Sequence, residues 1–104
     1  MSELEKKVYN FLTTIPKGKV VTYKDIATYL GNPNLCRVVG NILHKNPDPI
    51  KYPCYKVVNS KGQLAKNFGD IGGINTQANR LLKDGIEVVD FKVDLEKFRY
   101  KINS

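Results

Sequence analysis

Hydrophobic residues recur at helical spacing near the start of the 104-residue chain. The apolar positions lie at i, i+4, i+7, i+8 and i+11, and they are Leu4, Val8, Phe11, Leu12 and Ile15. This spacing predicts one face of an amphipathic helix over residues 4–15, and the sequence "PKG" at 16–18 ends it.

A second helix is predicted directly after a short β-branched segment. The sequence "KVVTY" at 19–23 favours an extended backbone. Thr22 is a suitable N-cap because Asp25 follows three residues later, in a near capping-box arrangement. The apolar side of this helix consists of Ile26, Ala27 and Leu30. Gly31 is expected to end it.

The sequence "GNPN" at 31–34 predicts a turn before a third helix. We expect Asn34 to cap a helix over "LCRVVGNILHKN" at 35–46. Its buried face is predicted to be Leu35, Val38, Val39 and Ile42. The opposite face carries Cys36, Arg37, Gly40, Asn41 and His44. Two short helices joined by a tight turn form a helix-turn-helix, and the second is the recognition helix.

The predicted recognition face is unusual because a single arginine stands among small residues. Small residues allow a helix backbone to approach nucleic acid closely, as minor-groove binding requires. Glycine inside a helix costs about 1 kcal/mol relative to alanine. Gly40 therefore indicates a close contact, either with DNA or with another helix. The alternative is a solvated helix face that happens to carry one arginine and one glycine.

After residue 46 the sequence predicts shorter elements. Three prolines within "NPDPIKYP" at 46–53 predict a loop. "CYKVV" at 54–58 predicts a short strand, and "NSKG" at 59–62 predicts a turn. "LAKNFGDIGG" at 64–73 is a glycine-punctuated loop.

The last third is predicted to contain two helices and a hairpin. Asn75 or Thr76 can cap a helix that runs through Leu82 and ends at Gly85. "IEVVDFKV" at 86–93 predicts two short strands around Asp90, a small hairpin or wing. Asp94 can cap a final helix with Leu95, Phe98 and Ile102 on its apolar side. The predicted fold is α+β and mainly α: a winged helix-turn-helix DNA-binding domain with short strands, as a single domain over residues 1–104.

The charge balance supports nucleic acid as a partner. The chain has 17 Lys and Arg against 10 Asp and Glu, a formal net charge of +7. An excess of this kind is typical of nucleic-acid binders, although it also fits a merely soluble basic protein. No apolar run approaches the roughly 18 residues of a membrane span. Because the first residues are charged rather than apolar, we expect no membrane association and a cytoplasmic location, or a nuclear one in a eukaryote.

Metal and cofactor sites are not expected. Cys36, Cys54 and His44 lack the short paired spacings of a structural zinc site. A disulfide between the two cysteines is disfavoured in a reducing compartment.

The order of these motifs closely resembles the C-terminal DNA-binding domain of the O6-alkylguanine-DNA alkyltransferase family. The chain reads "GKVVTY" at 18–23, "GNPN" at 31–34, "RVVG" at 37–40 and "NPDPIKYPCYKVVNSKG" at 46–62, in the family's order and at matching spacings. The resemblance covers about residues 4–86. The family's usual N-terminal ribonuclease-H-like domain has no counterpart in these residues. In this the chain is similar to the single-domain alkyltransferase-like proteins, which bind alkylated guanine without repairing it.

The resemblance implies a role for each matching residue. Tyr23 matches the tyrosine that helps to turn the target nucleotide out of the duplex, and Arg37 matches the arginine that enters the base stack from the minor groove. Asn46 matches an asparagine that braces the helix-turn-helix against the site loop, and Cys54 matches the alkyl acceptor. Further DNA contacts are expected from Thr22, Gly40, Asn41, Lys45 and Lys56. The expected partner is double-stranded DNA with an alkylated guanine, bound by a monomer, and a repair-pathway protein is a further candidate partner.

The chain departs from the family pattern next to the cysteine. The family has His where this chain has Tyr55, a glutamate where it has Asp84, and an arginine where it has Lys56. A tyrosine with a pKa of ~10 is not a general base at neutral pH, so the catalytic set of Cys54, Tyr55 and Asp84 is weakened. "NFGDIGG" at 67–73 occupies the place of the family's pocket-lining loop.

Three functions remain open at this point. The first is flipping of O6-alkylguanine and irreversible transfer of the alkyl group to Cys54, without a cofactor. The second is a non-enzymatic lesion sensor that signals to another repair pathway. The third is a general helix-turn-helix transcription regulator, which the small residues of the recognition face disfavour.

Overall fold

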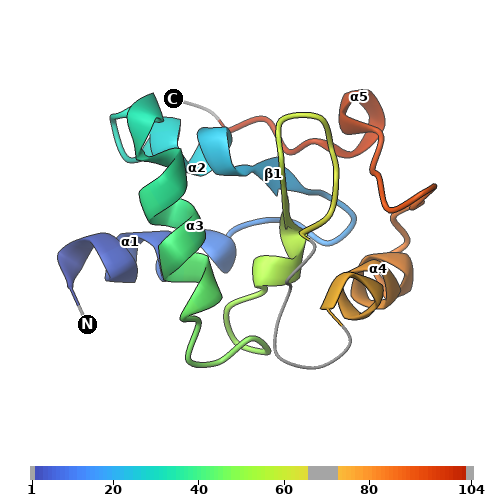
Figure 1. The fold of residues 1–104 in the computed structure, drawn as a ribbon, viewed down its shortest axis with the longest axis horizontal. Coiled ribbons are helices and arrows are strands. Elements are labelled where there is room, and N and C mark those ends of the chain that lie inside the picture. Colours follow the sequence, from blue (N-terminus) through green and yellow to red (C-terminus); the bar gives the residue numbers. More distant parts are fainter. Residues whose placement is uncertain (1, 66–72, 103–104) are drawn as a thin grey trace.

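The computed structural model describes residues 2–65 and 73–102, in which a small sheet lies between two groups of helices (Figure 1). The elements, in chain order, are α1 (Glu3–Leu12), β1 (Val21–Thr22), α2 (Tyr23–Tyr29), η1 (Pro33–Leu35), α3 (Cys36–His44), η2 (Cys54–Lys56), β2 (Val57–Val58), α4 (Gly73–Lys83) and α5 (Leu95–Phe98). Strand β1 pairs with β2 in parallel, with Val21 opposite Val57 and Thr22 opposite Val58. The predicted class, α+β and mainly helical with a helix-turn-helix and short strands, is confirmed.

The sheet separates two apolar clusters. Val21 and Val57 belong to the cluster built by α1, α2 and α3, whereas Val20 and Val58 belong to a second cluster with α4 and the segment after it. Successive side chains of a strand point to opposite faces, so two short strands contribute to both clusters. The chain on each side of the sheet is thereby fixed relative to the other.

Helix α1 is shorter than its apolar periodicity predicts. Ser2 caps it, and the side chain of Glu5 accepts a hydrogen bond from the Ser2 N–H, which completes a capping box. The helix ends at Leu12, so the prediction of a helix to residue 15 is wrong at its C-terminal end. Ile15 is nevertheless 4% exposed and belongs to the first cluster, which explains why it continues the apolar pattern.

Helix α2 begins as the sequence predicts. The Asp25 N–H donates to the Thr22 hydroxyl at 3.0 Å, and the Thr22 N–H donates to the Asp25 carboxylate at 2.9 Å. Gly31 follows the helix with a φ of +94°, the left-handed conformation that glycine adopts readily at a helix end. Both predictions, the capping box and the terminating glycine, are confirmed.

The start of the recognition helix differs from the prediction. Asn32, rather than Asn34, is the capping residue: its side chain accepts a hydrogen bond from the Asn34 N–H at 3.0 Å and caps the 3₁₀ turn η1. Pro33 occupies the first position of that turn, where its missing N–H costs nothing. Helix α3 then continues directly from η1 without a side-chain cap.

The buried face of α3 is rotated relative to the predicted one. Val39, Ile42 and Leu43 are buried, whereas Val38 is 38% exposed and Leu35 is half-buried. The predicted place of Val38 in the buried face is therefore wrong. Two overlapping apolar sets share this helix, and periodicity alone cannot choose between them. Packing against α1 makes the choice, because the Tyr9 hydroxyl donates to the Ile42 carbonyl at 2.6 Å.

The two elements predicted on either side of the glycine-rich loop need correction. "CYKVV" is not one strand: Cys54–Lys56 forms the 3₁₀ turn η2, and only Val57–Val58 is extended. Helix α4 begins at Gly73 and not at a cap on Asn75 or Thr76. Its end is as predicted, because Gly85 has a φ of +83° and its N–H donates to the Leu82 carbonyl at 3.0 Å. Most of the loop between these elements, residues 66–72, lies outside the described residues.

The predicted hairpin at 86–93 is reduced to a tight turn. Val89 and Lys92 exchange two backbone hydrogen bonds of 3.0 Å around Asp90 and Phe91, which both have positive φ. This is the backbone of a two-residue hairpin turn, but one bridge takes the place of two strands. The Val93 N–H donates to the Gly62 carbonyl at 2.8 Å, so the turn is attached to the preceding "NSKG" turn.

The C-terminal segment adds to the edge of the sheet. Asp94 caps α5 as predicted, but the helix ends at Phe98, so the prediction that Ile102 belongs to it is wrong. The Val20 N–H donates to the Phe98 carbonyl at 2.9 Å, and the Tyr100 N–H donates to the Val20 carbonyl at 2.8 Å. These bonds hold the chain beside Val20 in a parallel bridge centred on Arg99.

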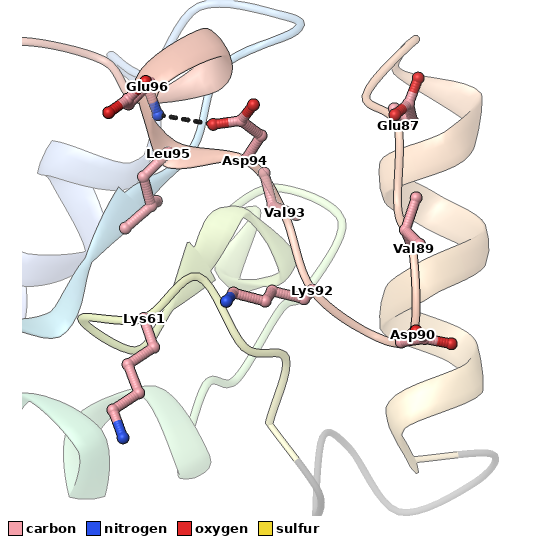
Figure 2. Close-up of a pocket in the computed structure, with 9 residues that line it drawn as sticks. All are labelled: Lys61, Glu87, Val89, Asp90, Lys92, Val93, Asp94, Leu95 and Glu96. Carbon is pink, nitrogen blue, oxygen red and sulfur yellow. Dashed lines mark hydrogen bonds between the residues drawn. The ribbon is translucent and has the colours of Figure 1, made fainter.

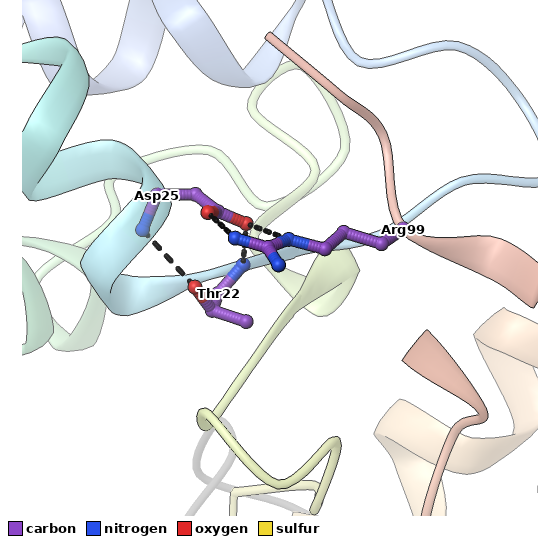
Figure 3. A network of polar contacts seen from close by, with 3 residues as sticks. All are labelled: Thr22, Asp25 and Arg99. Atoms are coloured by element: carbon purple, nitrogen blue, oxygen red, sulfur yellow. Dashed lines mark hydrogen bonds and ion pairs between the residues drawn. The ribbon is translucent and has the colours of Figure 1, made fainter. Parts of the chain in front are cut away.

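An ion pair joins this segment to the start of α2 (Figure 3). The Arg99 guanidinium donates to both carboxylate oxygens of Asp25, with an Nε–Oδ2 distance of 3.1 Å. Burial alone would raise the pKa of Asp25, but the hydrogen bonds from Arg99 and Thr22 outweigh burial and lower the pKa below 3.8. The unfolded chain therefore binds more protons near this pH, and the stabilisation by Asp25 increases with pH.

We predict that Asp25→Asn reduces the free energy of unfolding at pH 7 by about 1 kcal/mol, through loss of the ion pair. The stabilisation is complete above pH 3.8 and is lost as the pH falls through the lower pKa of the folded state. The difference between wild type and variant should thus shrink as the pH falls below about 4, as measured by urea denaturation. Glu3→Gln, which breaks the exposed Glu3–Lys6 pair, serves as the control. A difference that stays constant with pH would contradict this account.

Candidate functional site

Cys54 opens the 3₁₀ turn η2, at the end of the proline-rich loop. Its N–H donates to the Tyr52 carbonyl at 2.8 Å. The Asn46 amide also donates to that carbonyl, at 2.7 Å, and its oxygen accepts the Asp48 N–H at 3.0 Å. Asn46 follows α3 by two residues, so it links the end of the recognition helix to the residues before Cys54. This is the geometry expected of the predicted brace.

The same loop is held against α1 by an aromatic pair. The rings of Tyr9 and Tyr52 stack with centroids 5.2 Å apart, and Lys51 lies above the Tyr52 ring. Tyr9 also bonds to α3 through Ile42, so it connects three segments of the chain. Sequence reasoning gave Tyr9 no role, because its ring lies beside the apolar face of a helix and its partners are distant in sequence.

The Cys54 thiol lies in a half-buried position against the first apolar cluster. Burial raises the pKa of Cys54 above 9.0, although Asn46, a backbone hydrogen bond and the positive charge of Arg80 partly oppose this. The thiol is therefore less ionised at neutral pH than an exposed cysteine would be. The chain's one histidine, His44, is exposed in the last turn of α3.

Tyr55 and Asp84 are brought together as the resemblance implies. The Tyr55 hydroxyl donates to the Asp84 carboxylate at 2.7 Å, across the space between η2 and the end of α4. Burial and then this hydrogen bond raise the pKa of Tyr55. The phenol thus keeps its proton and directs it to Asp84, which leaves Tyr55 unable to deprotonate Cys54.

Two predicted DNA contacts are turned inward. Lys56 is 7% exposed, and its ammonium donates to the Ile15 carbonyl at 2.9 Å. Burial lowers the pKa of Lys56, and the nearby charge of Asp84 opposes this. Thr22 is 4% exposed and its hydroxyl caps α2. These two side chains are thus largely inaccessible in this structure, where they hold the first cluster and α2 in place.

The outer stripe of α3 remains accessible. Arg37, Asn41 and Lys45 are exposed, and no atom outside the helix lies within 4 Å of the position that a Cβ would take on Gly40. Within the described residues, no other helix therefore covers Gly40. Of the two close contacts that its presence indicates, packing against another helix of the described chain is excluded.

Tyr23 connects the helix-turn-helix with the cysteine. It is the first residue of α2, half-buried, and packs against the first cluster together with Cys54. Burial raises the pKa of Tyr23, and the proximity of Cys54 raises it further. Tyr23 and Asn46 thus both lie close to Cys54, and Asn46 connects this site to the end of α3.

Sequence reasoning missed Gln77 and Arg80. Gln77 is fully buried in α4, and it bonds to the backbone on both sides of Lys56. The positive charge of Arg80 acts on both Cys54 and Tyr55. A glutamine four residues before the buried Leu81 was the available signal, since it places an amide on an apolar helix face.

A groove of about 540 Å³ lies elsewhere, beside the turn at Asp90 (Figure 2). Its lining residues are Lys61, Glu87, Val89, Asp90, Lys92, Val93, Asp94, Leu95 and Glu96. It includes none of the predicted site residues. In residues 2–65 and 73–102 no cluster of three or more His, Cys, Asp or Glu side chains could hold a metal ion. Nor is any helix of that part long and apolar enough to cross a membrane.

Comparison with known proteins gives the same assignment along most of the chain. Residues 3–86 match the family described as 6-O-methylguanine DNA methyltransferase, DNA binding domain. A bifunctional methyltransferase/endonuclease of Picrophilus torridus is 39% identical over 98 residues, which are 94% of this chain and 32% of that protein. A DNA base-flipping protein of Vibrio parahaemolyticus is 33% identical and is matched over 99% of its length.

A solved structure has the same fold. The crystal structure of Schizosaccharomyces pombe Atl1 in complex with damaged DNA containing O6-carboxymethylguanine superposes with a TM-score of 0.85, at 36% identity and over 98% of both chains. This chain thus spans about a third of the bifunctional relative and nearly all of the other two. The sequence match, the helix-turn-helix and the placement of Cys54 agree, and the chain belongs to the 6-O-methylguanine DNA methyltransferase family, through its DNA-binding domain.

Proposed function

We propose that this protein binds duplex DNA from the minor groove and recognises an O6-alkylated guanine that has been turned out of the base stack. The grouping of Tyr23 and Asn46 around Cys54, together with the accessible stripe of α3, carries the proposal. The damaged DNA bound by S. pombe Atl1 and the base-flipping name of the Vibrio relative support it. The net charge of +7 supplies attraction to phosphates.

The proposed mechanism divides the work among few residues. Gly40 lets the α3 backbone approach the groove, while Arg37 enters the stack and fills the space left by the flipped base. Flipping costs a few kcal/mol, and an inserted side chain offsets part of this cost. An O6-alkyl group weakens pairing with cytosine, so the damaged base is easier to extrude than guanine. Tyr23 then guides the nucleotide toward Cys54.

Recognition, rather than rapid repair, is the activity that the geometry supports best. Alkyl transfer requires Cys54 Sγ to attack the alkyl carbon while the bond from carbon to O6 breaks and guanine leaves. The thiol proton must be lost, and guanine must regain one. Tyr55 accepts no proton because it donates to Asp84, and the raised pKa of Cys54 keeps the thiol neutral. Transfer through the small thiolate population is the second candidate function, favoured by the position of Cys54 itself.

This proposal has consequences for partners. If the lesion remains on the DNA, a second protein must remove it, so a repair-pathway protein is a necessary partner of the recognition function. We further propose that the protein acts on DNA as a monomer, without a cofactor, in the cytoplasm or in the nucleus of a eukaryote.

Arg37→Ala should weaken binding to a duplex with one O6-methylguanine by about tenfold or more, because the vacated stack is no longer filled. Fluorescence anisotropy with matched damaged and undamaged duplexes measures this. Lys83→Ala, at the exposed end of α4, removes the same charge and should change either affinity less than threefold, as expected of a solvent-screened charge outside α3. Equal affinity of the wild type for both duplexes would refute the proposed function.

Gly40→Ala should stabilise the protein and weaken DNA binding at the same time. Its backbone is helical and nothing obstructs a Cβ, so the free energy of unfolding should increase by up to about 1 kcal/mol. Affinity for damaged and undamaged duplexes should fall together, because the added methyl group holds α3 away from both. Chemical denaturation and anisotropy check the two effects. Unchanged affinity would show that α3 does not approach DNA at this position.

Intact-mass analysis after long incubation with excess O6-methylguanine duplex should show slow methylation of Cys54. The rate should rise about tenfold per pH unit above pH 7, since only the thiolate reacts. Tyr55→His should accelerate this methylation at pH 7 by providing a base.

Cys54→Ala should leave the affinity for the damaged duplex unchanged within about twofold, the difference expected when no hydrogen bond is lost. Fast methylation of the wild type at pH 7 would instead favour the repair enzyme.

A further inference from the structure

Gln77 makes three hydrogen bonds from a fully buried position in α4. Its amide nitrogen donates to the Tyr55 carbonyl at 3.0 Å and to the Val57 carbonyl at 2.9 Å. Its amide oxygen accepts the Ala65 N–H at 2.8 Å. One side chain thus ties α4 to the turn η2, to strand β2 and to the end of the segment after the "NSKG" turn.

These bonds act on the backbone that presents Cys54 and Tyr55. A 3₁₀ turn of three residues has few internal hydrogen bonds, and its groups need outside partners to adopt one orientation. On the α3 side, Asn46 fixes the residues before Cys54. On the α4 side, Gln77 holds the Tyr55 carbonyl and Tyr55 bonds to Asp84. Both α4-side contacts therefore depend on the position of α4.

The amide is better suited to this task than any apolar side chain of the same size. An apolar residue would leave the Tyr55 and Val57 carbonyls without the Gln77 donor, and an unpaired buried carbonyl is costly. The two carbonyls and the N–H also demand a side chain with two donors and one acceptor, which glutamine supplies. All buried polar side-chain atoms of the described residues have partners, so the bonds of Gln77 belong to a complete network.

We infer that Gln77 is a positioning residue for lesion discrimination: it fixes the orientation of the Cys54–Tyr55 turn against which the flipped base is recognised. This inference rests on the proposed lesion-binding function. Gln77 itself touches no DNA in this role, and it acts through the backbone of Tyr55.

The test compares Gln77→Met and Gln77→Glu with the wild type. The first removes all three hydrogen bonds at similar volume, and the second replaces the two amide donors with a carboxyl group that donates at most one hydrogen bond and keeps an acceptor for Ala65. For both variants, the ratio of affinities for damaged and undamaged duplex should fall by about tenfold, because each leaves at least one carbonyl of the turn or strand without its donor and one such bond is worth about that factor. Binding to the undamaged duplex should stay within about threefold, because the α3 surface is unchanged.

A destabilised control separates positioning from stability. Val93→Ala removes buried apolar volume from the second cluster, and the Val93 side chain takes no part in the hydrogen bonds of Gln77 to Tyr55, Val57 and Ala65. It should lower the melting temperature but keep the ratio of affinities. If Gln77→Met lowers only the melting temperature and keeps the ratio, the inference is wrong.

A measurement without DNA distinguishes failure of this inference from failure of the proposed function. In Gln77→Met the loosened turn should expose Cys54, so its carbamidomethylation by iodoacetamide should accelerate relative to that of Cys36 in the same molecule. Unchanged relative reactivity would overturn the positioning role. If the wild type fails to distinguish the two duplexes, the proposed function fails, whereas the cysteine measurement still decides whether Gln77 orients the turn.

Discussion

The parallel pairing of Val21–Thr22 with Val57–Val58 is the constraint on which the rest of the structure depends. Parallel strands cannot be joined by a tight turn, so a crossover connection must lie between them. Here that connection contains α2, the turn η1, the recognition helix α3 and the proline-rich loop. The DNA-binding motif is therefore closed at both ends by one small sheet. Its orientation relative to Cys54, which opens the 3₁₀ turn directly before the second strand, follows from that closure.

A sheet of two residues per strand is too small to be stable alone, so other contacts must maintain it. Both faces are covered, by the α1–α2–α3 cluster on one side and the α4 cluster on the other. The C-terminal segment adds a third backbone beside Val20, and Arg99 bonds to Asp25, which completes the capping box of α2. The elements farthest from the recognition helix in sequence thus hold its supporting helix in place.

The sequence was a sufficient guide to the elements whose signals are local. The capping box of Thr22 and Asp25, the glycine that ends α2 and the cap of Asp94 each depend on residues within three or four positions. Predictions that depend on distant partners were less accurate. Contact with Tyr9 determines which face of α3 is buried. Lys56 is turned inward by a hydrogen bond to a carbonyl 41 residues away in the sequence. No local pattern shows that a lysine will find such a partner.

The residues of the candidate site also differ in whether the sequence could predict them. The resemblance placed Tyr23, Asn46, Cys54, Tyr55 and Asp84 together, and the structure brings these residues to one region. It could not supply Gln77, whose partners are backbone groups and leave no trace in side-chain motifs. Nor could the resemblance show that the Lys56 ammonium donates a hydrogen bond to a backbone carbonyl inside the protein.

The pairing of Tyr55 with Asp84 has a consequence for what the site can do. A histidine bonded to a carboxylate gains basicity and can take a proton from a neighbouring thiol, but a phenol bonded to a carboxylate only loses acidity. The Tyr55–Asp84 pair still joins η2 to α4, so it keeps a structural role. It cannot accept the thiol proton, however. In the proposed function, recognition of a flipped base needs shape, stacking and an ordered turn, and none of these requires a proton acceptor at Tyr55. Transfer needs an ionised thiol, and burial of Cys54 without a base opposes it.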